Sequence, residues 1–106
     1  MEITRLEEMV LDAIANDFED LSQIVRDVTK FGLAEKVAVE QDDVVFALRG
    51  LVQKGFADGY RLAGEESPRP VRIADWGSLE ELYFFRTDSG KTYLTGLAER
   101  EEPGRD

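Results

Sequence analysis

Hydrophobic residues recur at spacings of three and four in three successive stretches of the first half of the chain, which is the pattern of amphipathic helices. The first stretch begins with T-R-L-E at Thr4, a Ser/Thr-x-x-Glu sequence typical of a helix start, and ends near Asn16. Its apolar positions are Ile3, Leu6, Met9, Val10, Ala13 and Ile14. We therefore predict a first helix that buries one face.

A second stretch with the same spacing follows, and two aspartates precede it. Asp17 and Asp20 are competing N-caps, because an aspartate at this position accepts hydrogen bonds from free backbone N–H groups. The apolar positions are Leu21, Ile24, Val25 and Val28. We expect this helix to stop by Lys30 or Phe31, before Gly32, since glycine is common just past helix ends.

The third stretch covers about residues 41–54. Asp42 and Asp43 lie in its first turn, where carboxylates interact favourably with the helix dipole, and Gly55 suits the left-handed conformation that often ends a helix. The apolar positions are Val44, Val45, Leu48, Leu51 and Val52. Because no such helix can bury its apolar face alone, we predict that all three pack around one core.

After the third helix, the hydrophobic period changes to one that suits short strands. The partly alternating positions are Phe56, Asp58, Tyr60 and Leu62. A second apolar run covers residues 82–85 and ends at Arg86. Between the two, residues 64–81 are rich in Gly, Pro, Ser and charge, and two prolines interrupt them. We predict a strand, a long excursion that is too polar for the core, and a second strand.

The C-terminal part of the chain permits two interpretations. Thr87 is a candidate N-cap for a short helix, with apolar positions at helical spacing. These positions are Tyr93, Leu94, Leu97 and Ala98. The alternative is a hairpin that turns at residues 88–90, with residues 91–95 as a third strand. We favour the helix, and expect one domain over residues 1–100 and a frayed acidic tail over residues 101–106.

Composition narrows the chemistry that the chain can perform. It has 106 residues, 42% of them hydrophobic, and 23 acidic against 13 basic side chains give a net charge of −10. There is no cysteine and no histidine, which excludes disulfides and Cys-based zinc sites and removes the commonest general base. No signal peptide or membrane span is recognisable, so we expect a cytoplasmic protein. We expect no catalysis, no cofactor and no obligate metal.

Two local sequences resemble the winged helix-turn-helix domain of bacterial transcriptional regulators. The first, residues 44–57, reads V-V-F-A-L-R-G-L-V-Q-K-G-F-A and is similar to the family's recognition helix with its Leu-x-x-Leu-Val-x-x-Gly-Phe ending. The second, residues 83–94, reads Y-F-F-R-T-D-S-G-K-T-Y-L and is similar to the final wing strand and the start of the following helix, with Arg-Thr in place of Leu-Thr. The resemblance covers residues 3–100. It implies an α+β, mainly helical fold, in which a three-helix bundle carries a small antiparallel β-wing and a short C-terminal helix.

Two segments depart from the family pattern. Residues 31–40 separate the second and third helices, against the turn of 3–4 residues in an ordinary helix-turn-helix. The sequence F-G-L-A-E-K-V in this segment can form an extra helical turn. The excursion over residues 64–81 is also long for a wing.

The resemblance implies that the third helix, about residues 41–54, enters the major groove of double-stranded DNA and that the wing, about residues 56–86, contacts the backbone. The outward stripe of this helix is expected to be Asp42, Phe46, Arg49 and Gln53. Arg49 and Gln53 suit guanine and adenine edges, and Phe46 suits a thymine methyl. The expected phosphate contacts of the wing are Arg61, Arg69 and Arg72. A homodimer that reads paired half-sites also follows from the resemblance.

The charge balance favours a different partner. Residues 1–55 carry 6 basic and 12 acidic side chains, net −6, and residues 56–106 carry 7 basic and 11 acidic side chains, net −4. Phosphates repel such a surface unless basic groups gather locally. The alternative is therefore an acidic winged-helix module that binds a basic protein partner and not DNA, with Phe46 and Trp76 as interface anchors.

Simpler roles also remain open for the same side chains. Arg49 and Gln53 can belong to a solvated helix face, and Phe46 can pack beneath the wing or residues 31–39. Trp76 can anchor its loop on the body of the domain. The wing arginines can pair locally with carboxylates that lie nearby in sequence, each exposed pair contributing little. These carboxylates are Glu65, Glu66, Asp75, Glu80 and Glu81.

Overall fold

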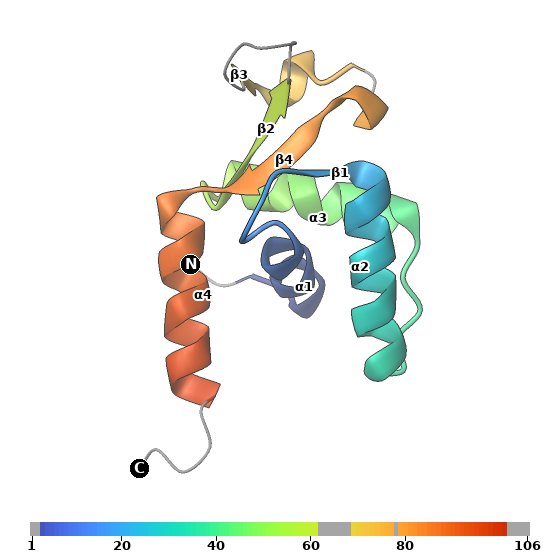
Figure 1. Ribbon diagram of the computed structural model, residues 1–106, viewed down its shortest axis with the longest axis vertical. Helices are drawn as coiled ribbons and strands as arrows, with labels where there is room; N and C mark the ends of the chain where they lie inside the picture. The colour runs from blue at the N-terminus through green and yellow to red at the C-terminus, as the bar shows by residue number, and fades with distance from the viewer. Residues whose placement is uncertain (1–2, 62–68, 78, 102–106) are drawn as a thin grey trace.

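The computed structural model describes residues 3–61, 69–77 and 79–101, and these residues form four helices and a small antiparallel sheet at one end of the molecule (Figure 1). The helices are α1 (Arg5–Ala13), α2 (Leu21–Ala34), α3 (Gln41–Gln53) and α4 (Asp88–Glu101). The strands are β1 (Glu19–Asp20), β2 (Ala57–Arg61), β3 (Arg69–Val71) and β4 (Tyr83–Arg86). Two 3₁₀ turns, Ile73–Asp75 and Leu79–Glu81, lie between β3 and β4. The predicted α+β class, mainly helical, is confirmed.

The predicted helix starts are confirmed, and the structure decides between the two N-cap candidates of α2. The Thr4 hydroxyl accepts a hydrogen bond from the Glu7 N–H at 3.1 Å, and the Glu7 carboxylate accepts one from the Thr4 N–H at 2.9 Å. This reciprocal capping box begins α1. Asp20, rather than Asp17, caps α2, since its carboxylate accepts from the Gln23 N–H at 2.8 Å.

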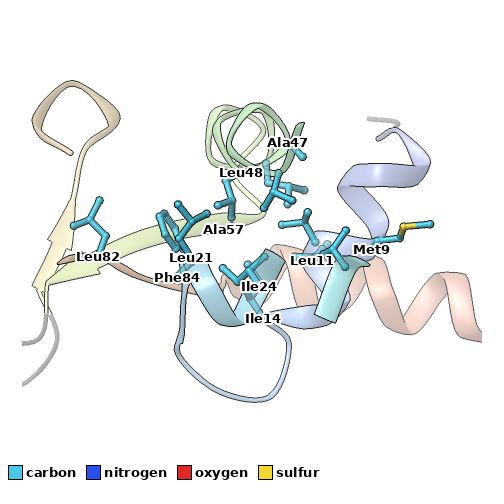
Figure 2. Close-up of a cluster of buried hydrophobic side chains, with 14 of the residues drawn as sticks. Met9, Leu11, Ile14, Leu21, Ile24, Ala47, Leu48, Ala57, Leu82 and Phe84 are labelled. Atoms are coloured by element: carbon cyan, nitrogen blue, oxygen red, sulfur yellow. The ribbon is translucent and has the colours of Figure 1, made fainter. Parts of the chain in front are cut away.

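The core lies where the first three helices meet the inner face of the sheet (Figure 2). Its largest fully buried side chains come from α1, the residue after it, α2, α3, β4 and the residue before β4. They are Val10, Leu11, Ile14, Ile24, Val28, Val44, Leu48, Leu51, Leu82 and Phe84. Each such side chain stabilises the fold by about 1.5–3 kcal/mol relative to exposure. The predicted tri-helical core is confirmed, and the sheet closes it.

The sheet has the order β1-β4-β2-β3, and every pairing is antiparallel. β2 and β4 confirm the two predicted strands, and β2 with β3 forms the hairpin of the wing. β1 and β3 were not predicted. The alternation expected in β2 was out of phase: Ala57 and Gly59 are buried on the inner face, whereas Tyr60 lies on the outer face. Residue 62, which belonged to that expected alternation, lies outside the described residues.

The predicted end of α2 was wrong, because the helix continues through Gly32 to Ala34. Gly32 is buried, and a Cβ there would lie 2.6 Å from the Val37 carbonyl oxygen, so glycine permits a close backbone approach. The left-handed residue is instead Lys36, with φ 60°. The extra helical turn expected in residues 31–40 is thus the last turn of α2.

The excursion between the two predicted strands contributes to the core, contrary to expectation. Trp76 is only 2% exposed, and its ring meets that of Phe84 edge-on at 5.3 Å. Its Nε1 donates a hydrogen bond to the Val71 carbonyl at 3.0 Å. On the inner face of β2, a Cβ on Gly59 would lie 2.9 Å from Trp76 Nε1, so the missing side chain makes room for the indole. The interpretation of Trp76 as the anchor of its loop is confirmed.

The helical interpretation of the C-terminal region is confirmed, and the hairpin alternative is wrong. The Thr87 hydroxyl accepts a hydrogen bond from the Gly90 N–H at 3.1 Å and donates one to the Gly55 carbonyl at 2.6 Å. Gly55, with φ 80°, ends α3 in the left-handed conformation as predicted. The Thr87 N–H donates to the Phe56 carbonyl at 2.9 Å. From there α4 runs down one side of the molecule to Glu101, and residues 102–106 of the expected tail lie outside the described residues (Figure 1).

Candidate nucleic-acid interface

The outward stripe predicted for α3 is present. One side of the helix buries Val44, Ala47, Leu48 and Leu51 against the core. The opposite side exposes the four expected residues, which are Asp42, Phe46, Arg49 and Gln53. Phe46 is 80% exposed, so it packs neither beneath the wing nor against residues 31–39. The stripe therefore presents an aromatic ring between charged and amide side chains.

Arg49 and Gln53 supply the hydrogen-bonding groups of this stripe. In the described part of the chain, Arg49 forms no ion pair and no side-chain hydrogen bond. A planar guanidinium has donors suited to the O6 and N7 acceptors of guanine, and a carboxamide pairs with N6 and N7 of adenine. Both side chains are thus available to a partner.

The N-terminal end of α3 is acidic. The Asp43 carboxylate accepts a hydrogen bond from the Glu40 N–H at 3.0 Å, which stabilises the start of the helix. Asp42 has no such role among the described contacts and stays on the exposed stripe. A carboxylate at this end repels phosphates, and its acceptor oxygens suit the exocyclic amine of cytosine.

The wing brings the three predicted arginines onto or beside one hairpin. Arg61 of β2 and Arg69 of β3 are directly opposite in the antiparallel register, so their side chains leave the same face. Arg72 follows β3, and its side chain is 92% exposed. Carboxylates lie close to Arg61 and Arg72: Arg61 Nη1 is 3.7 Å from Glu81 Oε2, and Arg72 Nε is 3.9 Å from Asp75 Oδ2.

These local pairs support the expected local role of the wing arginines without excluding a phosphate role. Exposed pairs of this length contribute at most about 1 kcal/mol, so a phosphate can compete for the same guanidinium. Arg61 also donates to the Asp75 carbonyl at 3.4 Å, which holds its head group near the base of the excursion. The hairpin rises from the C-terminal end of α3 in Figure 1.

An ion pair between α1 and α3 holds the exposed helix in place, and sequence reasoning missed it. Glu7 is only 5% exposed, and Lys54 Nζ, just past the end of α3, donates to its carboxylate oxygens at 2.7 and 3.0 Å. Burial alone would raise the pKa of Glu7, but the hydrogen bonds from Lys54 and Thr4 outweigh it and lower that pKa. A Cβ on Gly50 would collide with the Glu7 carboxylate, so glycine lets the two helices meet there.

An aromatic cluster on the outer face of the sheet supports the base of the wing. The ring of Phe18, in the loop before β1, stacks on Phe85 at 4.7 Å and meets Tyr60 edge-on at 5.1 Å. Partial burial raises the pKa of Asp58 on the same strand as Tyr60. The same effect, with the neighbouring Asp58 charge, raises the pKa of Tyr60. A single aromatic residue in a polar loop carries no periodic signal, so the role of Phe18 was not predictable.

The described residues contain neither a cluster of metal ligands nor a helix that could span a membrane. No group of three or more acidic side chains is arranged to hold a metal ion there. Among those residues, no helix has the length and apolar character that crossing a membrane requires.

Three packed helices, the third with an exposed polar face, followed by a β-hairpin, define the winged helix-turn-helix class. Searches against protein-family models and against curated protein sequences return no match. Solved structures do match. The chain superposes on Bacillus subtilis PadR, crystallised in complex with operator DNA, with a TM-score of 0.64 at 17% identity. It also superposes on a PadR-like transcription factor from Bacteroides fragilis, with a TM-score of 0.57 at 14% identity.

These matches show a PadR-like winged-helix fold. The first match covers 97% of this chain and 51% of the Bacillus subtilis chain, so this chain spans about half the length of that protein. The second covers 90% of this chain and 78% of the Bacteroides fragilis chain.

Proposed function

We propose that this protein is a DNA-binding transcriptional regulator of the winged-helix type and not an enzyme. The observation that carries the proposal is the exposed stripe of α3 beside an arginine-bearing hairpin. The fold that presents this stripe is similar to that of a protein crystallised with its operator DNA. The proposed activity requires access to DNA, which in a bacterial cell is in the cytoplasm.

Five of the predicted residues have specific roles in this proposal. Arg49 and Gln53 contact guanine and adenine edges in the major groove and so determine sequence preference. Arg61, Arg69 and Arg72 contact phosphates and so determine register and affinity. The protein acts as a homodimer, whose two copies of α3 read half-sites about one helical turn apart.

The net charge of −10 limits the affinity of this interaction. Charges more than a Debye length away, about 8 Å at physiological salt, are largely screened, so the arginines nearest the DNA dominate the binding. We therefore expect DNA binding that is weak at physiological salt and that strengthens steeply as salt is lowered. Removing one arginine that binds a phosphate reduces the slope of log affinity against log salt by about 0.9.

The decisive experiment selects bound duplexes from a random library at low ionic strength and measures affinity by fluorescence anisotropy over a salt series. Arg49→Ala with Gln53→Ala is expected to abolish sequence preference while leaving residual binding. Arg72→Ala is expected to weaken binding to all sequences and to reduce the salt slope. Lys30→Ala, an exposed cation near the end of α2, is the matched control and should change neither. Failure to retain any duplex at low salt would refute the proposal.

The second candidate function is an acidic protein-interaction module. The net charge favours it, as does Phe46, an 80% exposed aromatic side chain that could anchor a basic partner. Trp76 is no longer a candidate anchor, because it is buried. This function predicts that no duplex is retained while a lysine-rich polypeptide binds at low salt and loses affinity on Phe46→Ala.

A further inference from the structure

Phe46 stands apart from the other large hydrophobic side chains that the described residues expose. Phe31, Leu33 and Val37 belong to the end of α2 and the loop after it, and Figure 1 shows the last turn of α2 far below α3. Phe46 instead projects from α3 itself, one turn after Asp42 and one turn before Arg49, on the stripe that packing leaves uncovered. The ring thus contributes little to the core, and its immediate neighbours on the helix are hydrogen-bonding groups.

The spacing along α3 suits neighbouring base pairs. An α-helix rises 1.5 Å per residue, so Phe46 and Arg49 are separated by about 4.5 Å along the axis, and Arg49 and Gln53 by about 6 Å. Successive base pairs of DNA are about 3.4 Å apart. A helix inclined to the groove therefore places Phe46 over a base pair that adjoins, or lies one step from, the pair that Arg49 contacts.

A phenyl ring can distinguish the bases through one group of the DNA only, the methyl group of thymine. The major-groove edge of each base pair carries hydrogen-bond donors and acceptors, and the C5-methyl of thymine is its one apolar group. Phenylalanine cannot pair with the amine of cytosine or adenine or with the acceptors of guanine. Covering those groups would leave them without hydrogen bonds, which disfavours the three other bases at this position.

We infer that Phe46 is a specificity-determining residue that recognises the C5-methyl group of a thymine within one or two base pairs of the guanine contacted by Arg49. This inference rests on the proposed DNA-binding function and adds the base that the aromatic position selects. A basic protein segment is the competing occupant. The polar neighbours of the ring favour DNA, since a hydrophobic protein anchor is ordinarily surrounded by further apolar contacts.

The test removes the methyl group alone. In the best duplex from the selection, each thymine in turn is replaced by deoxyuridine, which keeps base pairing and every hydrogen-bonding group. Removing one methyl from an apolar contact is expected to weaken binding by the wild-type protein about fourfold at one thymine per half-site. Phe46→Ala is expected to bind the thymine duplex more weakly and to lose the difference between thymine and uracil.

Two controls separate this role from a general loss of binding or folding. Leu33→Ala removes another exposed apolar side chain, 73% exposed, and is expected to keep the full discrimination between thymine and uracil. In a duplex with cytosine at that position, 5-methylcytosine should restore about fourfold for the wild type and nothing for Phe46→Ala. Phe46→Ala should unfold at the same urea concentration as the wild type, because the ring is 80% exposed.

Equal affinity for thymine and uracil at every position, measured on a duplex that the wild type binds, would overturn the inference while leaving the proposed function intact. Discrimination that persists undiminished in Phe46→Ala would assign the methyl contact to another residue and would overturn it equally. If the wild type retains no duplex at all, the proposed function fails and the inference fails with it.

Discussion

Glu7→Gln tests whether the ion pair between α1 and α3 holds the exposed helix in position. The carboxylate is almost fully buried and accepts hydrogen bonds from Lys54 Nζ at 2.7 and 3.0 Å and from the Thr4 N–H at 2.9 Å. Glutamine has nearly the same shape and can keep the bond to Thr4. The substitution therefore removes the negative charge and turns the contact with Lys54 into a weaker one.

The structure sets the size of the effect. Hydrogen bonds to charged groups contribute about 1.5–3 kcal/mol. The Lys54 side chain is 28% exposed and can turn toward water when its partner is removed, so the lower end of this range applies. We expect Glu7→Gln to reduce the free energy of unfolding by about 1.5 kcal/mol. Lys54→Met should cost more, about 3 kcal/mol, because it leaves a buried carboxylate without a counter-charge.

The pH dependence identifies the charge as the cause. The pKa of Glu7 is lowered in the folded protein, so its contribution is fully present above its unfolded value of about 4.3 and is lost as pH falls through the folded pKa. The difference between wild type and Glu7→Gln should therefore shrink in acid. The adjacent Glu8→Gln is the control, since Glu8 pairs with the 59% exposed Arg5, and it should cost no more than about 0.5 kcal/mol.

The assay is urea unfolding of each variant, followed by tryptophan fluorescence, at neutral pH and at about pH 3, below the unfolded Glu pKa. If Glu7→Gln unfolds at the wild-type urea concentration, the pair does not stabilise the fold. If its cost is unchanged in acid, the loss comes from packing and not from charge.

Three further outcomes follow from buried groups. Trp76 should fluoresce at short wavelength and resist iodide quenching until the protein unfolds, and Trp76→Phe, which removes the hydrogen bond to the Val71 carbonyl, should cost about 1–3 kcal/mol in urea unfolding followed by circular dichroism. Gly90→Ala should destabilise by about 1–3 kcal/mol in thermal unfolding, because a Cβ there collides with the Phe56 carbonyl; an unchanged midpoint would show that α4 can shift freely. Burial raises the pKa of Asp58, so the stability linked to it is present below its usual value of about 3.9 and is lost as pH rises through the raised pKa. Asp58→Asn should therefore raise the urea midpoint at neutral pH and leave it unchanged near pH 3, and a lower midpoint at neutral pH would contradict this.

The features that sequence predicted correctly depend on contacts within a few residues. The capping box at Thr4, the left-handed Gly55 and the N-cap at Thr87 each satisfy backbone groups of their own helix. Such signals have the same meaning in almost any tertiary setting. The exposed stripe of α3 was predictable for a similar reason, since one buried face fixes the other.

The features that sequence missed depend on residues far apart along the chain. A glycine at position 32 is typical of a helix end, but its role here is to let the backbone of Val37 approach the last turns of α2. β1 has only two residues, too few for any alternation, and exists because it pairs with the edge of β4. Glu7 looks like any surface carboxylate until Lys54, 47 residues away, is placed beside it.

The candidate site also has features that depend on local spacing and features that depend on residues far apart in the chain. The identity of the stripe residues was predictable from helical spacing, whereas spacing left open whether Phe46 and Trp76 pack against the domain or stay exposed. Phe46 lies on the exposed face of α3, whereas the space that Gly59 leaves beside Trp76 lets the indole be enclosed. The contacts of the wing arginines likewise required the strand register that pairs Arg61 with Arg69.

The hydroxyl of Thr87 joins two helices that are distant in sequence. It donates a hydrogen bond to the carbonyl of Gly55, just past the end of α3, and accepts one from the Gly90 N–H in the first turn of α4. The Thr87 backbone N–H also donates to the Phe56 carbonyl. The 14-residue α4, about 21 Å long, is therefore anchored at its N-terminal end to the C-terminal end of α3. A partner that binds the far end of α4 therefore acts on the orientation of α3 and, under the proposed function, on the angle at which the domain approaches DNA.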